Sequence, residues 1–375
     1  MHVALVTETY PPEINGVALT VQHLAEGLRA LGHRVELVRP RRPEESDGET
    51  PDLLLAPSLP LPRYRELRFG LPIRRRLLAR WRRERPEAIY IATEGPLGWS
   101  ALRAARRLGI PVATGYHTRF PEFMRHYRLG LLSPLAERWL RRFHNRAQAT
   151  LVPTEELREE LAGRRYAAPR LLSRGVDARL FHPERRDPAL RAELGVGERG
   201  LLVLYLGRIA PEKNLELAVR GFRALQTLRP EARYLWVGDG PARAALAAAN
   251  PDFRFVGMRR GEELARHVAS ADLFLFPSLT ETFGNVVLEA MASGVATVAF
   301  DYGAARQHLE PGTGLRVPCG DEEGFVAAAL RLAGDDGLRQ QMAFAARRAA
   351  ERLDLGRVAR DFAALLAGLA HREAA

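Results

Sequence analysis

Two basic side chains stand five positions apart after an apolar run in the second half of the chain. Arg208 and Lys213 follow the run 201–206, and Lys213 is the only lysine among 56 basic residues. A guanidinium group presents a planar fork to phosphate oxygens, and an ammonium group acts as a compact point charge. This pair therefore predicts a loop that neutralises a leaving nucleoside diphosphate. The alternative is a solvated pair of cations in an ordinary loop.

Two carboxylates form a second candidate site. Glu281 and Glu289 are separated by seven residues, and Gly284 and Asn285 between them begin a helical pattern after the apolar run 272–277. We expect Glu281 to bind a sugar from the loop and Glu289 to accept hydrogen bonds from ribose hydroxyls. The amides at the helix start would then face phosphate. An exposed helix carboxylate is the plain structural alternative for Glu289.

Two loops in the first half of the chain also follow apolar runs. Gly16 comes after the run 2–6 and opens a long helical pattern, where a diphosphate or sugar can approach a glycine backbone closely. An ordinary Pro-Gly turn remains the alternative there. His117 follows the run 112–115, and a single histidine at a strand end is either structural or catalytic.

Short apolar runs alternate with helical patterns along the whole chain. This alternation is typical of parallel sheets covered by helices, in which the loops after the strands gather at one sheet edge. The sequence thus predicts an α/β fold with two doubly wound, Rossmann-like domains. The predicted strands are 2–6, 35–38, 52–56, 88–92, 112–115, 149–153, 201–206, 233–238, 253–256, 272–277 and 296–300, and long predicted helices are 17–31, 215–228, 322–332 and 357–370.

The length of 375 residues suits two domains and hence a cleft. A polar stretch with several arginines and prolines, 175–200, interrupts the alternation and is the best linker candidate. We expect an N-terminal domain over 1–173 and a C-terminal domain over 174–355. The last helix, 356–375, has an apolar stripe and is expected to pack back on the N-terminal domain.

Composition limits where the chain works. No window approaches the roughly 18 unbroken apolar residues of a membrane helix. The first residues have the pattern of a buried strand rather than that of a signal peptide. A single cysteine, Cys319, excludes an intrachain disulfide and a cysteine-rich zinc site. We therefore expect a cytoplasmic protein.

Taken together, the candidate sites resemble the family 4 glycosyltransferases of the GT-B fold. The resemblance rests on the first glycine-containing loop, the Arg-x4-Lys pair, VGDGP at 237–241 and the Glu-x7-Glu segment, in this order across nearly the whole chain. Bacterial α-mannosyltransferases that build glycolipids from GDP-mannose are similar in further segments, which are YHTRF at 116–120, FHNRA at 143–147, RGVD at 174–177 and LFHP at 180–183.

The resemblance implies two domains that face each other across a cleft and transfer a hexose with retention of configuration. The implied donor is GDP-mannose, and the implied acceptor is a lipid-linked sugar or glycolipid. His117 would lie near the sugar and the acceptor. The implied donor-binding residues are Gly16, Arg208, Lys213, Val256, Met258, Glu281, Phe283, Gly284, Asn285, Val286 and Glu289, and the implied catalytic residues are His117, Arg208, Lys213 and Glu281.

Family members retain configuration without a proven enzyme nucleophile, so electrostatic preorganisation is the expected source of catalysis. No metal is implied, because Asp239 has no second acidic ligand nearby and the two cations already neutralise the diphosphate. No cofactor is expected beyond the nucleotide-sugar substrate, GDP-mannose or a UDP-hexose. Two alternatives stay open: a UDP-sugar-dependent glucosyl or sulfoquinovosyl transferase, and a nucleotide-sugar epimerase of the same fold.

The net charge of +11 is concentrated in segments 63–85 and 119–146. Such basic segments with apolar stripes are typical of helices on an anionic membrane surface, so we expect a peripheral enzyme on the inner face of the cytoplasmic membrane. The alternative is that the stripes are core. No nucleic-acid-binding motif is present, and no nucleic-acid partner is expected. The stripes at helical spacing are Phe69, Ile73, Leu77 and Trp81, then Leu132, Leu135, Trp139 and Phe143.

Overall fold

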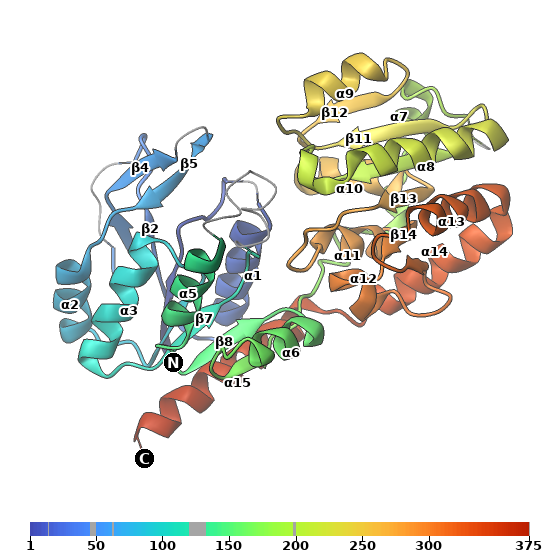
Figure 1. Ribbon diagram of the computed structural model, residues 1–375. Coiled ribbons are helices and arrows are strands. Elements are labelled where there is room, and N and C mark those ends of the chain that lie inside the picture. Colours follow the sequence, from blue (N-terminus) through green and yellow to red (C-terminus); the bar gives the residue numbers. More distant parts are fainter. Residues whose placement is uncertain (14, 46–49, 62–63, 120–132, 198–199, 375) are drawn as a thin grey trace. The chain divides into compact units, whose positions relative to one another are not determined.

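A computed structural model describes residues 1–13, 15–45, 50–61, 64–119, 133–197 and 200–374 (Figure 1). The chain divides into two compact units, each with its own parallel sheet. Unit 1 contains the described residues up to Arg174 together with those from Leu355 onward. Unit 2 runs from Gly175 to Asp354. The two doubly wound sheets confirm the predicted α/β class.

Unit 1 contains a seven-stranded sheet in the order β3-β2-β1-β6-β7-β8-β9, with parallel neighbours throughout. The strand order reverses between β1 and β6. In open α/β sheets, ligands bind outside the carboxyl ends of the strands at such a switch point. The strands are β1 (His2–Val6), β2 (Arg34–Pro40), β3 (Leu53–Ala56), β6 (Ala88–Ile91), β7 (Val112–Gly115), β8 (Ala149–Val152) and β9 (Pro169–Leu171).

Helices cover both faces of this sheet, and they are α1 (Gly16–Ala30), α2 (Arg74–Arg83), α3 (Pro96–Leu108), α5 (Ser133–His144), α6 (Glu155–Gly163) and α15 (Leu355–Ala374). Val3 of β1 lies in one apolar core, and its neighbour Ala4 lies in another, because successive side chains of a strand point to opposite faces. Phe362 and Leu366 of α15 are fully buried in the core that holds Val3. The C-terminal helix is therefore an integral part of unit 1.

The first basic segment is not one continuous helix. Its first part forms β5 (Tyr64–Gly70), which pairs with β4 (Ser58–Leu61) in an antiparallel hairpin, and Phe69 lies opposite Leu59. The predicted helical stripe is therefore wrong at Phe69. Ile73, Leu77 and Trp81 do share a face, but that face is buried in the core of unit 1.

Unit 2 contains a six-stranded parallel sheet in the order β12-β11-β10-β13-β14-β15. Its switch point lies between β10 and β13, so the loops after these two strands flank the expected ligand site. The strands are β10 (Leu202–Leu206), β11 (Arg233–Val237), β12 (Arg254–Gly257), β13 (Leu273–Phe276), β14 (Ala296–Phe300) and β15 (Leu315–Val317).

The helices of unit 2 bury both faces of its sheet. Leu202 and Leu204 of β10 belong to one core, and Val203 belongs to the other. The helices are η2 (Pro183–Arg185), α7 (Pro188–Glu193), η3 (Pro211–Lys213), α8 (Leu215–Leu228), α9 (Arg243–Ala249), α10 (Gly261–Ala269), α11 (Asn285–Ala292), α12 (Gly303–His308), α13 (Glu322–Gly334) and α14 (Asp336–Ala350).

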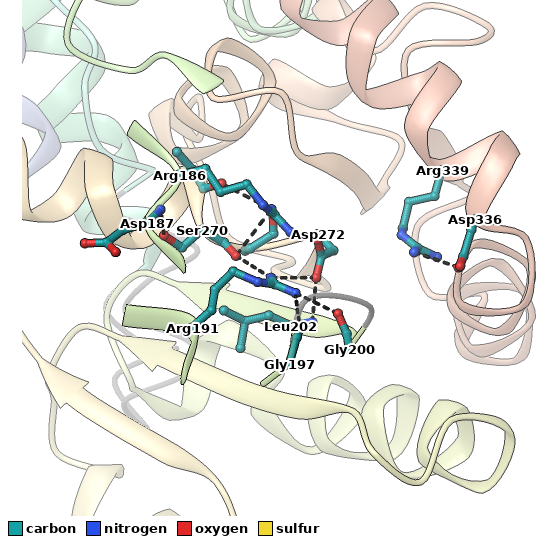
Figure 2. A network of polar contacts seen from close by, with 12 residues as sticks. Arg186, Asp187, Arg191, Gly197, Gly200, Leu202, Ser270, Asp272, Asp336 and Arg339 are labelled. Carbon is teal, nitrogen blue, oxygen red and sulfur yellow. Dashed lines mark hydrogen bonds and ion pairs between the residues drawn. The ribbon is translucent and has the colours of Figure 1, made fainter. Parts of the chain in front are cut away.

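The stretch 175–200 does not behave as a linker in its described part. It forms η2 and α7, and Phe181 and Leu190 lie in the core of unit 2. Arg191, only 4% exposed, lies 2.9 Å from Asp272 and also donates to the carbonyl oxygens of Ser270 and Gly200 (Figure 2). The polar composition thus reflects an internal ion-pair network.

The described residues include no helix that is both long and apolar enough to cross a membrane.

Candidate active site

The loops after β10 and β11 are in backbone contact at the carboxyl edge of the unit 2 sheet. Ile209 N donates to Asp239 O at 2.9 Å. A Cβ atom on Gly238 would lie 2.0 Å from Gly207 O, so only glycine fits at that position. Gly238 also has a φ of +138°, a conformation that other residues rarely adopt. The VGDGP segment therefore serves to hold the Arg208 loop in place.

Both predicted phosphate-binding cations lie beside the switch point of unit 2. Arg208 follows the end of β10 and pairs with the buried carboxylate of Glu212. Lys213 ends η3, and its Nζ lies 2.5 Å from Glu281 Oε1. Arg208 and Lys213 thus each have a carboxylate partner.

Several contacts hold Glu281 in the loop between β13 and α11. Ser278 Oγ donates to Glu281 Oε1 at 2.9 Å, and the Glu281 backbone N–H donates to the hydroxyl of Tyr302. Ala304 N donates to Phe283 O at 2.7 Å, which ties the same loop to the start of α12. The position of Glu281 is therefore set by the neighbouring loop after β14.

Glu289 lies on α11 and is partly buried. The helix begins at Asn285, after Gly284 in a left-handed conformation with a φ of 95°. Burial raises the pKa of Glu289 to about 7, from an ordinary value near 4.5. A carboxyl group with this pKa gains from hydrogen-bond donors such as ribose hydroxyls, because these stabilise its charged form.

The remaining predicted donor-binding residues of unit 2 are differently placed. The Phe283 side chain is 6% exposed and belongs to the core, so only its backbone is available to a ligand. Val256 and Val286 are partly buried and pack against the same core. Met258 follows β12 and is 41% exposed, which leaves its side chain free to meet a base.

Gly16 and His117 belong to unit 1. Gly16 is the first residue of α1 and is exposed. The preceding Asn15 caps this helix, because its side-chain oxygen accepts a hydrogen bond from Ala18 N at 2.8 Å. The helix start therefore presents a glycine backbone at the carboxyl edge of the sheet, next to the end of β1.

His117 is held between two neighbours. Arg174 NH2 donates to its Nδ1 at 2.6 Å, and Tyr90 Oη lies 2.7 Å from its Nε2. Burial, together with the charge of Arg174, lowers the pKa of His117 well below its ordinary value. Because Nδ1 accepts from arginine, the neutral ring carries its proton on Nε2 and donates to Tyr90. His117 is thus a fixed, uncharged ring.

Sequence reasoning missed the residues that hold these groups in place. Glu212, Ser278 and Tyr302 contact Arg208 or Glu281, and Tyr90 and Arg174 contact His117. Arg174 lies in the RGVD segment and Glu212 lies within the Arg-x4-Lys motif, so these two residues had a signal in the sequence. Tyr90 has the pattern of an ordinary strand residue.

No group of three or more His, Cys, Asp or Glu side chains is placed to hold a metal ion in the part of the chain that the structure describes.

Comparison with known proteins adds the family. Residues 14–180 match the model for Glycosyltransferase Family 4, and residues 200–335 match the model for Glycosyl transferases group 1. The GDP-mannose-dependent alpha-mannosyltransferase of Mycobacterium tuberculosis is 34% identical over 354 residues, which are 93% of this chain and 91% of that protein. The phosphatidyl-myo-inositol mannosyltransferase of Mycolicibacterium smegmatis is 30% identical over 342 residues, which are 86% of this chain and 82% of that protein.

Solved structures agree on the fold. The Anabaena protein HepE, crystallised with UDP, matches with a TM-score of 0.76 at 18% identity and covers 98% of this chain and 100% of its own. The fold is therefore GT-B, as predicted. The alternative of a nucleotide-sugar epimerase is not better supported, because these relatives and both family models are glycosyltransferases. The chain belongs to the family 4 retaining glycosyltransferases.

Proposed function

We propose that this enzyme transfers mannose from GDP-mannose to a glycolipid acceptor. The observation that carries the proposal is the cluster of Arg208, Lys213 and Glu281 at the switch point of unit 2. The names of the mannosyltransferases that match most of the chain support the choice of donor and acceptor.

In this mechanism the leaving diphosphate replaces the carboxylates as partner of the two cations. As the glycosidic bond to phosphate breaks, negative charge grows on GDP and positive charge grows on the sugar. Arg208 and Lys213 stabilise the first charge, and Glu281, once released from Lys213, faces the sugar. Glu289 binds the ribose. The leaving phosphate accepts the proton of the acceptor hydroxyl, so no enzyme base is needed.

The donor is tested by thermal unfolding with GDP, UDP and ADP. A nucleotide at about 100 times its dissociation constant adds about 2.7 kcal/mol to the free energy of unfolding. We expect the largest stabilisation with GDP and its loss in Lys213→Ala. Transfer of labelled mannose from GDP-mannose to extracted lipid then checks the reaction. A larger effect of UDP would instead support a UDP-sugar-dependent glucosyl or sulfoquinovosyl transferase.

We further propose that α5 provides a membrane-binding surface. Leu135 and Trp139 are 64% and 42% exposed, and Arg138 and Arg142 on the same helix are exposed as well. The apolar stripe of α2 is buried in the core of unit 1, whereas part of the apolar stripe of α5 is exposed to solvent. Leu132 lies outside the described residues. Near an anionic leaflet, each basic residue adds about 1 kcal/mol to binding before screening.

Vesicle flotation tests this surface. Binding to phosphatidylglycerol vesicles is expected at low salt, and it should weaken in Arg138→Ser/Arg142→Ser. The matched control is Arg75→Ser/Arg82→Ser on α2, which removes the same charge from exposed positions beside a buried face. If the protein does not bind at low salt, or the two double variants bind equally, the α5 surface is wrong and the glycosyltransferase assignment stands.

A further inference from the structure

We infer that Glu94 is an acceptor-binding residue, which accepts hydrogen bonds from the hydroxyl groups of an uncharged polyol such as a sugar ring or glycerol. His144 is its positioning residue. The inference rests on the proposed function and specifies that the acceptor of that reaction presents an uncharged polyol to the enzyme.

Glu94 lies at the switch point of unit 1. It is the third residue after β6, and Thr93 beside it accepts a hydrogen bond from Glu8 N, just after β1, at 2.8 Å. Unit 2 carries Glu281 at the corresponding place, in the loop after β13. In both units a glycine caps the helix that follows this loop, Gly95 before α3 and Gly284 before α11. In each sheet, the loop on the far side of the switch point thus presents a carboxylate where open α/β sheets bind ligands.

The backbone on both sides of Glu94 is closely packed. A Cβ atom on Gly95 would lie 2.1 Å from Glu8 Oε1, and one on Gly98 would lie 2.0 Å from Thr93 O. Pro96, the first residue of α3, restricts the backbone further. The loop therefore has little freedom, and the direction of the Glu94 side chain is preorganised.

A buried histidine holds one oxygen of Glu94. His144 is 0% exposed, its Nε2 lies 3.2 Å from Glu94 Oε1 and its Nδ1 lies 2.8 Å from Thr114 Oγ1. An ionised carboxylate only accepts, so Nε2 donates to Glu94. The Glu94 side chain keeps 12% of its surface exposed, and its Oε2 has no hydrogen-bond partner among the described residues. One oxygen is thus anchored, and the other can accept from a ligand.

Two other carboxylates near this sheet, Glu8 and Glu36, have both oxygens occupied. Glu8 accepts from Gly70 N at 2.5 Å and from Leu97 N at 3.0 Å, and Glu36 binds Arg80 and Trp81. These groups are structural. Glu94 differs because only its Oε1 has a partner among the described residues. In the described part of unit 1, no arginine lies within ion-pair distance of Glu94 either.

The charge of Glu94 also fits a neutral ligand. Burial raises the pKa of Tyr90 and of Tyr116, and the nearby charge of Glu94 adds to both shifts. A carboxylate that no arginine neutralises accepts from hydroxyls and repels a phosphate group placed directly against it. The geometry thus selects a sugar or glycerol hydroxyl at this position.

The variant Glu94→Gln tests the inference in the enzyme. The neutral acceptor probes are octyl α-mannoside and dioctanoylglycerol, and the charged acceptor probe is dioctanoyl phosphatidylinositol. Gln keeps the size of the side chain and can still accept from His144. We expect the KM for the neutral probe to rise about tenfold or more, with the KM for GDP-mannose and the slow hydrolysis of the donor unchanged. His144→Asn, which cannot reach Glu94, should give a smaller rise. Glu159→Gln, on the exposed side of α6, is the matched control.

An NMR titration of octyl α-mannoside in the presence of GDP gives a readout that does not depend on turnover. Binding should weaken about tenfold in Glu94→Gln. The inference is overturned if the neutral probes do not bind wild-type enzyme, if Glu94→Gln changes the donor and acceptor constants alike, or if phosphatidylinositol is the better acceptor. Transfer to none of the three probes, together with wild-type binding of octyl mannoside, would instead contradict the proposed function.

Discussion

The two ends of the unit 2 sheet contain similar ion pairs with different roles. At the amino end, Arg191 is buried and shares Asp272 with Arg186 and with the amide of Leu202, the first residue of β10 (Figure 2). At the carboxyl end, Arg208 and Lys213 each pair with a carboxylate in a loop.

We expect the number of hydrogen bonds that each cation makes, rather than its charge, to distinguish the structural pair from the ligand-binding pairs. Arg191 donates to Asp272 and to three carbonyl oxygens, so an incoming anion would have to break several bonds at once. The Lys213 pair is a contact between two side chains that are 16% and 18% exposed, so a ligand with a higher charge can replace the carboxylate. We therefore expect a loss of stability when the first arrangement is broken and a loss of activity when the second is broken.

The largest expected effect is the loss of stability in Asp272→Ala. This change leaves Arg191 buried without its carboxylate, which costs about 3 kcal/mol or more. Urea unfolding measures this loss in the free energy of unfolding. Turnover per folded molecule should stay normal, because the strand β10 separates the Arg191 network from the proposed donor loops. The control is Asp252→Ala, whose partner Arg223 is 38% exposed, with an expected loss below about 1 kcal/mol. Equal losses in the two variants would remove the distinction.

The next effect is on catalysis. Lys213→Ala and Arg208→Ala should each lower turnover about 100-fold or more, equivalent to about 2.7 kcal/mol of transition-state stabilisation, with unchanged unfolding. Arg220→Ala is the control, since Arg220 forms an exposed pair with Glu322 on the same unit. Near-normal turnover in both variants would sink the assignment of the donor site.

A pH effect of about tenfold is expected from Glu289. Its pKa of about 7 means that the free enzyme is protonated there below neutrality. Donor binding to the carboxylate must release this proton, so the KM for the donor should be about tenfold higher at pH 6 than at pH 8. The free energy of unfolding changes in the opposite direction. The folded state binds the Glu289 proton more tightly than the unfolded state, so the contribution of Glu289 to stability falls as pH rises from about 4.5 to 7. Glu289→Gln should flatten both profiles, and an unchanged KM profile would contradict the role.

The smallest effect is expected from Tyr302→Phe. It removes the acceptor of the Glu281 amide and leaves the ring in place. A lost hydrogen bond of about 1 kcal/mol should lower kcat/KM about fivefold. Tyr205→Phe is the comparison, because its hydroxyl donates to Arg208 O at 2.9 Å and so tests the other donor loop. If Tyr302→Phe matches wild type, the loop after β14 does not position Glu281.

Much of the fold could be predicted because its signals are local. The alternation of apolar runs and helical patterns predicted β1, β6, β10 and β13 within one or two residues. The hairpin of β4 and β5 was missed because Phe69 continues the helical spacing of Ile73 and Leu77. Its pairing with Leu59 is a contact between separate segments, which the local pattern does not reveal. The stretch 175–200 misled for a related reason: several of its polar side chains pair with residues in distant segments. Arg186 and Arg191 pair with Asp272, and Asp187 pairs with Arg266.

The sequence by itself indicated the family, most strands in their order along the chain and the types of group expected to meet the donor, because spacing after each strand is a property of the local chain. Only the tertiary structure decided which partners hold the candidate site residues by hydrogen bonds. Tyr90 and Arg174 hold His117, and His144 holds Glu94, across 27, 57 and 50 residues of chain. Such partners meet only when the sheet is assembled. Burial and hydrogen bonding between distant segments produce no periodic pattern in the sequence, so the sequence alone could not reveal these contacts.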